Sequence, residues 1–186
     1  MVSPVADSRP APFIVTAELP RDLFAWADGL RRAHFPPERN KLQAHVTLFH
    51  AFAPSLRDEL LPLLKAIAAR HAPVPARLTG ALMPLGTGTA LALESPAMLC
   101  LRSMVAEHFH GALTVQDQHE PRLHITVQNK VEPAAAKALQ RQLSGTFPAR
   151  DFTFTGLGLH LYLGGPWEAA GIFPFRGKEM VDRAGR

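Results

Sequence analysis

Hydrophobic residues recur at two different spacings along this chain, and the two spacings predict strands and helices in alternation. Runs of β-branched, aromatic or strictly alternating residues predict strands, because neighbouring side chains of a strand point to opposite faces. Apolar residues three and four positions apart predict amphipathic helices. The predicted strands cover residues 12–19, 45–50, 123–129, 150–165 and 171–177, with two more joined by a glycine turn within 76–95, and the predicted helices cover residues 21–35, 55–70, 97–110 and 133–143.

The order of these elements predicts an α+β fold with mixed or antiparallel sheets. Several strands follow one another too closely for the helical crossovers that a parallel sheet requires. Pro62 lies inside the helix predicted over 55–70, so we expect a kink or an early end there. We expect one ordered domain over 12–177, between a flexible tail at 1–11 and a loose tail at 178–186.

The chain resembles itself when it is displaced by 79 residues, the difference between positions 45 and 124. This offset aligns two histidines, two threonines two positions further on, and leucines in the helices that follow. Such self-similarity indicates duplicated strand-helix units. Two such units often pack about a pseudo-two-fold axis, which would bring the equivalent strands together.

Composition narrows the class of protein. With 186 residues, of which 47% are hydrophobic and 19% charged, the chain can bury a sizeable core as one domain or as one domain of two lobes. The formal net charge of +4 suits an anionic partner. The single cysteine, Cys100, fits a reducing cytosol, so we expect a cytoplasmic protein. No apolar run approaches the ~18 residues of a membrane span.

The aligned positions carry residues suited to phosphate chemistry. In both "HVTL" (45–48) and "HITV" (124–127) a histidine and a threonine share one strand face. Pairing the units would bring His45 and His124 together, with Thr47 and Thr126 beside them. Two imidazoles on opposite sides of a phosphate can act as general base and general acid without a metal, since a pKa of about 6.5 allows either form near neutral pH. The threonine hydroxyls can donate to phosphate oxygens.

This paired motif resembles that of the two-histidine (2H) phosphoesterase superfamily, and in particular the bacterial 2'-5' RNA ligase and RNA 2',3'-cyclic phosphodiesterase family, over residues 12–177. The resemblance implies a bilobal fold, with helices outside and a central cleft. It implies hydrolysis of 2',3'-cyclic phosphates to 2'-phosphates, or reversible 2'-5' RNA ligation. The substrate would be an RNA end or a small cyclic nucleotide. No cofactor, metal or membrane is implied, and we expect a monomer.

By motif match, His45 and His124 are the expected catalytic pair and Thr47 and Thr126 the expected phosphate-binding residues. We take His124 as the base and His45 as the acid that protonates the departing O3'. The chain departs from the family after the second motif, where members often carry an arginine and this chain has "QNK". Lys130 could replace that arginine if the strand continues far enough to place it on the face of His124.

Other polar residues leave alternatives open. His50 lies five positions after His45, so strict alternation places it on the opposite strand face, as a strand-end or surface residue rather than a catalytic partner. His160 and Tyr162 face either the cleft, where they could contact a nucleotide, or an ordinary sheet surface. Trp167, in a glycine-rich segment, is interpreted as a loop anchor. Arg122 and Lys41 precede the motif strands and either add positive potential at the cleft mouth or lie on a solvated face.

Two other functions compete with catalysis by a histidine pair. The first is a non-catalytic RNA-binding or nucleotide-binding protein of the same fold. The second is a metal hydrolase, which is disfavoured because no HxxxH or HExxH cluster joins the two motifs.

Overall fold

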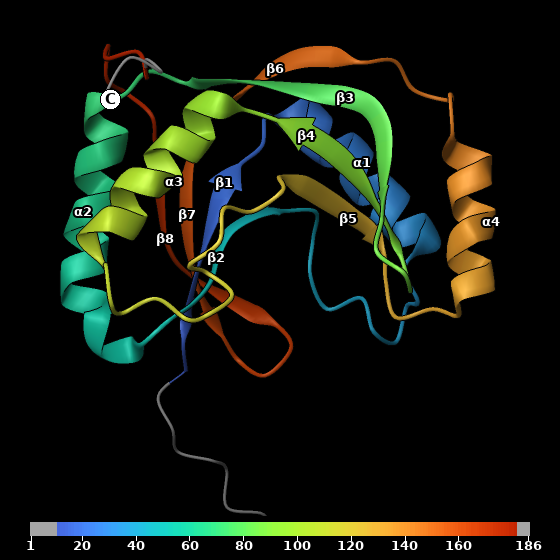
Figure 1. The fold of residues 1–186 in the computed structure, drawn as a ribbon, viewed down its shortest axis with the longest axis horizontal. Coiled ribbons are helices and arrows are strands. Elements are labelled where there is room, and N and C mark those ends of the chain that lie inside the picture. The colour runs from blue at the N-terminus through green and yellow to red at the C-terminus, as the bar shows by residue number, and fades with distance from the viewer. Residues whose placement is uncertain (1–10, 182–186) are drawn as a thin grey trace, which may run out of the picture.

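A computed structural model describes residues 11–181, which fold into two four-stranded antiparallel sheets with helices on the outside (Figure 1). The expected α+β, two-lobed architecture is confirmed. In chain order the elements are β1 (Phe13–Glu18), α1 (Arg21–His34), β2 (Val46–Phe52), the 3-10 helix η1 (Pro54–Leu56), α2 (Arg57–Arg70), β3 (Val74–Pro84), β4 (Thr89–Glu94), α3 (Pro96–His108), β5 (His124–Gln128), α4 (Pro133–Leu143), β6 (Arg150–Phe154), β7 (Gly156–Tyr162) and β8 (Trp167–Pro174).

The predicted duplication appears in the topology of the two sheets. Their strand orders are β2-β1-β7-β8 and β5-β4-β3-β6. The succession β1-α1-β2-α2 is repeated as β4-α3-β5-α4, and in each copy the first strand pairs antiparallel with the second. The strands that begin with the two histidine-threonine motifs, β2 and β5, are therefore equivalent edge strands of the two sheets.

The helices tie the two sheets together. Helix α1 packs on β5 of the second sheet, whereas α2 packs on β7 and β8 of the first (Figure 1). Helix α3 reaches the first sheet through Arg102, whose guanidinium lies 4.4 Å from the ring centre of Phe49. Phe109, just after α3, packs edge-on against Phe52. Helix α1 thus lies on the sheet of the other repeat, whereas α3 contacts that of the other repeat and also packs on β3 of its own sheet.

Two predicted elements differ from the structure. Helix α2 runs from Arg57 to Arg70 through Pro62, so the predicted early end is wrong. A proline early in a helix removes few backbone hydrogen bonds, and the fully buried Leu60 and Leu64 hold this helix in place. The single strand predicted over 150–165 is divided at Thr155, since β6 pairs with β3 in one sheet and β7 pairs with β1 in the other.

The predicted tails at 1–11 and 178–186 lie largely outside the described residues. Within the described part, Glu179 forms an isolated β-bridge with His71 at the end of α2. None of the helices between residues 11 and 181 has both the length and the apolar character needed to cross a membrane.

Candidate active site

One cavity of about 480 Å³ is lined by all four residues that the two motifs single out. His45 lies immediately before β2 and His124 is the first residue of β5. Thr47 and Thr126 follow two positions further along the same strands and line the same cavity. The structure therefore brings the two histidine-threonine pairs together across the boundary between the sheets.

The two histidines are held in the same way. Nδ1 of His45 lies 2.7 Å from the carbonyl oxygen of Gln43, and Nδ1 of His124 lies 2.7 Å from the carbonyl oxygen of Arg122. A carbonyl oxygen can only accept a hydrogen bond, so Nδ1 carries the hydrogen in both rings. In each neutral imidazole Nε2 is then the basic nitrogen, and in each imidazolium Nε2 carries the second proton. The matched geometry allows either ring to take or to give a proton.

Arg31, inside α1, fixes the segment before His45 relative to β5. Its Nε donates to Oδ1 of Asn40 at 2.8 Å and to the carbonyl oxygen of Leu42 at 2.9 Å. Its Nη1 donates to the carbonyl oxygen of Thr126 at 2.9 Å. Burial lowers the pKa of Arg31 to about 10, which still leaves the guanidinium charged at neutral pH. One buried side chain therefore sets the separation of the two motifs.

Asp28, one turn earlier on α1, holds the residue that precedes His45. Its Oδ1 accepts a hydrogen bond of 2.9 Å from the backbone N–H of Ala44, and its Oδ2 pairs with Arg32 at 3.1 Å. Asp28 and Arg31 are both only 4% exposed. Sequence reasoning missed them, because charged side chains of an amphipathic helix are ordinarily assigned to its solvent face.

The surroundings of the two histidines favour their neutral forms. Burial is the main cause that lowers the pKa of His45 to about 4, and the charge of Arg31 adds to it. Burial also lowers the pKa of His124, and the nearby His50 contributes in the same direction. Near pH 7 both rings of the free protein are neutral. A bound phosphate would raise both pKa values, since its negative charge favours the imidazolium.

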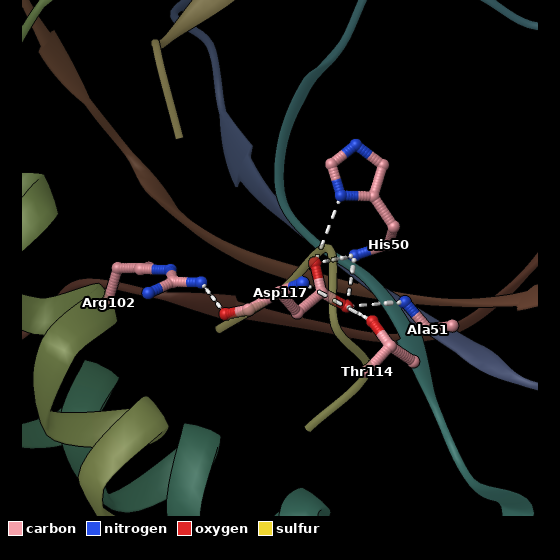
Figure 2. Close-up of polar contacts among 5 residues, drawn as sticks. All are labelled: His50, Ala51, Arg102, Thr114 and Asp117. Carbon is pink, nitrogen blue, oxygen red and sulfur yellow. Dashed lines mark hydrogen bonds and ion pairs between the residues drawn. The ribbon is translucent and has the colours of Figure 1, made fainter. Parts of the chain in front are cut away.

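His50 is exposed, as predicted, but it lines the same cavity, so its predicted placement on the opposite strand face is wrong. Strict alternation fails in β2 because the strand carries a bulge: Thr47 pairs with Thr16 but Phe49 pairs with the very next residue, Val15. Figure 2 shows His50 beside the buried carboxylate of Asp117, which belongs to the segment between α3 and β5.

Trp167 is also a cavity residue rather than the loop anchor that was predicted. It opens β8, and its ring centre lies 4.5 Å from that of His45 and 5.4 Å from that of His160. Beyond the His45–Trp167 contact lies a second cavity of about 520 Å³, bordered by both residues. Glycines close to Trp167 in the sequence favour a loop, which is why the start of a strand was not predicted there.

His160 faces this second cavity, which decides between its two predicted placements. Its Nε2 lies 3.0 Å from Oγ1 of Thr16, and that hydroxyl donates to Oε1 of Glu18 at 3.0 Å. Gly158 leaves room for these groups, since a Cβ there would lie 2.3 to 2.8 Å from all three side chains. Burial lowers the pKa of His160, although Glu18 opposes the effect.

The remaining predicted residues divide between the cavities and the surface. Arg122 lines the first cavity and Lys41 the second, so both contribute positive charge there. Tyr162 is 40% exposed and lines neither. Lys130 follows the end of β5 at Gln128, with a positive φ of 61°, and is not among the residues of either cavity. The strand ends too early for Lys130 to share the face of His124.

Within residues 11–181, no three histidine, cysteine, aspartate or glutamate side chains form a group that could hold a metal ion.

Comparisons with known proteins identify one matching family model and several structures of similar fold. A family model described as the 2'-5' RNA ligase superfamily matches residues 19–166. The crystal structure of TT0787 of Thermus thermophilus is 18% identical, with a TM-score of 0.60 over 89% of this chain and 98% of that one. Structures of E. coli LigT with NADP+ and with 3'-AMP are 16% identical, with TM-scores of 0.58 and 0.60, and each covers 90% of this chain and 99% of its own. These structures share the fold. No curated protein matches the chain.

Proposed function

The chain belongs to the 2'-5' RNA ligase superfamily of two-histidine phosphoesterases, and on this premise we propose that it hydrolyses 2',3'-cyclic phosphates of RNA ends or nucleotides to 2'-phosphates. Reversible 2'-5' RNA ligation would be the same chemistry with a 5'-hydroxyl in place of water. The observation that carries the proposal is the single cavity in which two matched histidine-threonine pairs meet. We further propose that the protein acts as a monomer in the cytoplasm.

We propose that the phosphate lies between the Nε2 atoms of His45 and His124. His124, neutral, takes a proton from the attacking water, and His45, as imidazolium, gives a proton to the departing O3' of the ribose. The hydroxyls of Thr47 and Thr126 donate to non-bridging oxygens as negative charge develops on them. The buried environment supports proton transfer, because it lowers both histidine pKa values in the free protein and a bound phosphate raises them again.

The second cavity is the proposed place for the nucleoside next to the phosphate. It shares His45 and Trp167 with the first cavity, so a ligand can extend from one to the other. Trp167 offers an aromatic face for a base, and the carboxylate of Glu18 can accept hydrogen bonds from a base or a ribose hydroxyl. Lys41 and Arg21, at the edge of this cavity, suit the backbone phosphates of an RNA.

Turnover in the presence of a chelator tests the proposal. Purified protein in excess EDTA would be given 2',3'-cyclic nucleotides and a short RNA ending in a 2',3'-cyclic phosphate, beside the variants His45→Ala and His124→Ala. We expect a 2'-phosphate product from the wild type, and at least a 100-fold slower reaction from each variant, since general acid-base catalysis contributes about 10²- to 10⁴-fold.

A folded wild-type protein that yields no product would contradict the proposal. Binding of the same RNA that survives His45→Ala would then favour the non-catalytic nucleotide-binding protein. Turnover that EDTA abolishes would favour a metal hydrolase.

A further inference from the structure

The bulge in β2 adds a third histidine to the cavity that holds the two motif histidines. Because of the extra residue, both Leu48 and Phe49 point into the core, where they are 2% and 0% exposed. His50 consequently returns to the face of Thr47. The cavity of about 480 Å³ is bordered by this histidine as well as by the two histidine-threonine pairs.

His50 is held by a buried carboxylate. Asp117 is only 2% exposed, and its oxygens accept hydrogen bonds from the backbone N–H groups of His50 at 2.9 Å and Ala51 at 3.0 Å. Oγ1 of Thr114 donates to the same carboxylate at 3.1 Å, and Nδ1 of His50 lies 3.0 Å away (Figure 2). Arg102 donates to the backbone carbonyl of Asp117, which anchors this segment on α3.

The carboxylate of Asp117 determines which nitrogen of the His50 ring carries a hydrogen. Burial by itself would raise the pKa of Asp117, but the hydrogen bonds from His50 and Ala51 outweigh burial and lower it below its ordinary value, so the carboxylate is ionised at neutral pH. An ionised carboxylate can only accept hydrogen bonds, so Nδ1 of His50 carries a hydrogen. Within residues 11–181 Nε2 has no hydrogen-bond partner, and Figure 2 shows it on the side of the ring away from Asp117.

Among the described residues, the cavity has few other sources of positive charge for a phosphate. His45 and His124 are neutral in the free protein near pH 7. Lys130, which could have replaced the family's arginine had the strand continued far enough, is not among the cavity residues. Apart from Arg122, which is exposed, the cavity is bordered by Arg102, whose guanidinium is directed to the Asp117 carbonyl, and by two further histidines, His50 and His119.

We propose that His50 is a phosphate-binding residue of this cavity, with its imidazolium held between the carboxylate of Asp117 and a non-bridging oxygen of the bound phosphate, to which Nε2–H donates. Asp117 is the positioning residue of the pair. The inference deepens the proposed function and rests on it for the identity of the substrate, but not for the binding of phosphate. A purely structural alternative is that the pair only clamps the segment before β5 onto β2.

Measuring the affinity for phosphate distinguishes a phosphate-binding role of His50 from the purely structural one. The affinity of the full chain for inorganic phosphate at pH 6 would be measured by calorimetry for the wild type, His50→Gln and Asp117→Asn. His108→Gln is the matched control, since His108 also pairs with a carboxylate, Glu59 at 2.8 Å, and is 41% exposed against 44% for His50, but lies outside the cavity. We expect His50→Gln to weaken phosphate binding about tenfold or more, Asp117→Asn to weaken it less, and the control to leave it unchanged.

A second measurement needs no variant. Titration of the wild type with inorganic phosphate, followed through the imidazole nitrogen resonances, should shift Nε2 of His50 strongly and that of His108 little. Equal phosphate affinity of wild type and folded His50→Gln would overturn the inference. So would a His50 resonance that phosphate does not move.

Kinetics distinguishes failure of this inference from failure of the proposed function. If the cyclic phosphate is hydrolysed, we expect His50→Gln to raise KM about tenfold with a smaller change in kcat, as loss of ground-state phosphate binding requires. Phosphate binding through His50 without any turnover would contradict the proposed function and leave this inference standing. Turnover with an unchanged KM in His50→Gln would contradict this inference and leave the proposed function standing.

Discussion

We expect mild acid to destabilise the protein partly through His45. The pKa of this residue is about 4 in the folded protein, against an ordinary value of 6.5, because burial disfavours the imidazolium. Between pH 6.5 and pH 4 the unfolded chain binds a proton at His45 that the folded chain does not. Folding stability is therefore lost as the pH falls through this window, and His45 contributes no such change above it.

The size of the effect follows from the same two values. The gap between 6.5 and about 4 is about 2.5 pKa units, and each corresponds to about 1.4 kcal/mol, so the upper limit is about 3.5 kcal/mol. His45 borders a cavity that water can enter, which screens part of this penalty. We expect a loss of about 1 to 3 kcal/mol of unfolding free energy between pH 7 and pH 4.

Urea unfolding of the wild type and His45→Gln at intervals from pH 7.5 to pH 4 measures this loss. The wild type should lose about 1 to 3 kcal/mol more than the variant over the window, because glutamine cannot take up the proton. His110→Gln, at an exposed position after α3, should follow the wild type. Parallel curves for the wild type and His45→Gln would refute the reasoning, and so would an NMR titration of His45 with a midpoint near 6.5.

Two further predictions concern the roles within the cavities. A cyclic phosphate whose bridging O3' is replaced by sulfur has a leaving group that needs no proton. We expect this substrate to raise the turnover of His45→Ala at least tenfold and to leave that of His124→Ala unchanged. Rescue of His124→Ala instead would mean that the proposed acid and base are exchanged. Gly158→Ala places a Cβ 2.3 to 2.8 Å from Glu18, Thr16 and His160, and we expect it to raise KM for a cyclic-phosphate RNA several-fold while kcat on a minimal cyclic phosphate changes little. The control is Gly165→Ala, where nothing lies within 4 Å of the added Cβ. An equal effect of the two variants would count against a nucleoside in the second cavity.

The sequence alone was sufficient for the fold and for the four residues that meet in the cavity. The repeated histidine-x-threonine spacing marks one strand face in each copy, and the offset of the copies predicts that these faces converge. Both inferences use local periodicity and one internal comparison, which a sequence carries directly. The division of residues 150–165 at Thr155 was not visible, because both halves have strand-like sequences and only their partners differ.

The residues of the site and its support that the sequence did not reveal were missed for a different reason. His50 was misplaced because a bulge changes the parity of a strand, and nothing in "HVTLFHAF" announces the extra residue. Asp117 comes from a segment without regular structure, so no period places it beside β2. Arg31 is buried because it satisfies carbonyl groups from two distant segments, and only the tertiary fold brings those together. Each case depends on pairing between segments rather than on a local pattern.

The interleaving of the two repeats has a consequence for how such a molecule can be divided. A chain cut between β3 and β4 would separate β1 from β7 in the first sheet and β3 from β4 and β6 in the second, so both sheets would be split. Helix α1 would also be separated from β5, on which it packs. Since neither half retains a complete sheet, we expect the two halves to fold only in each other's presence, with one histidine supplied by each half.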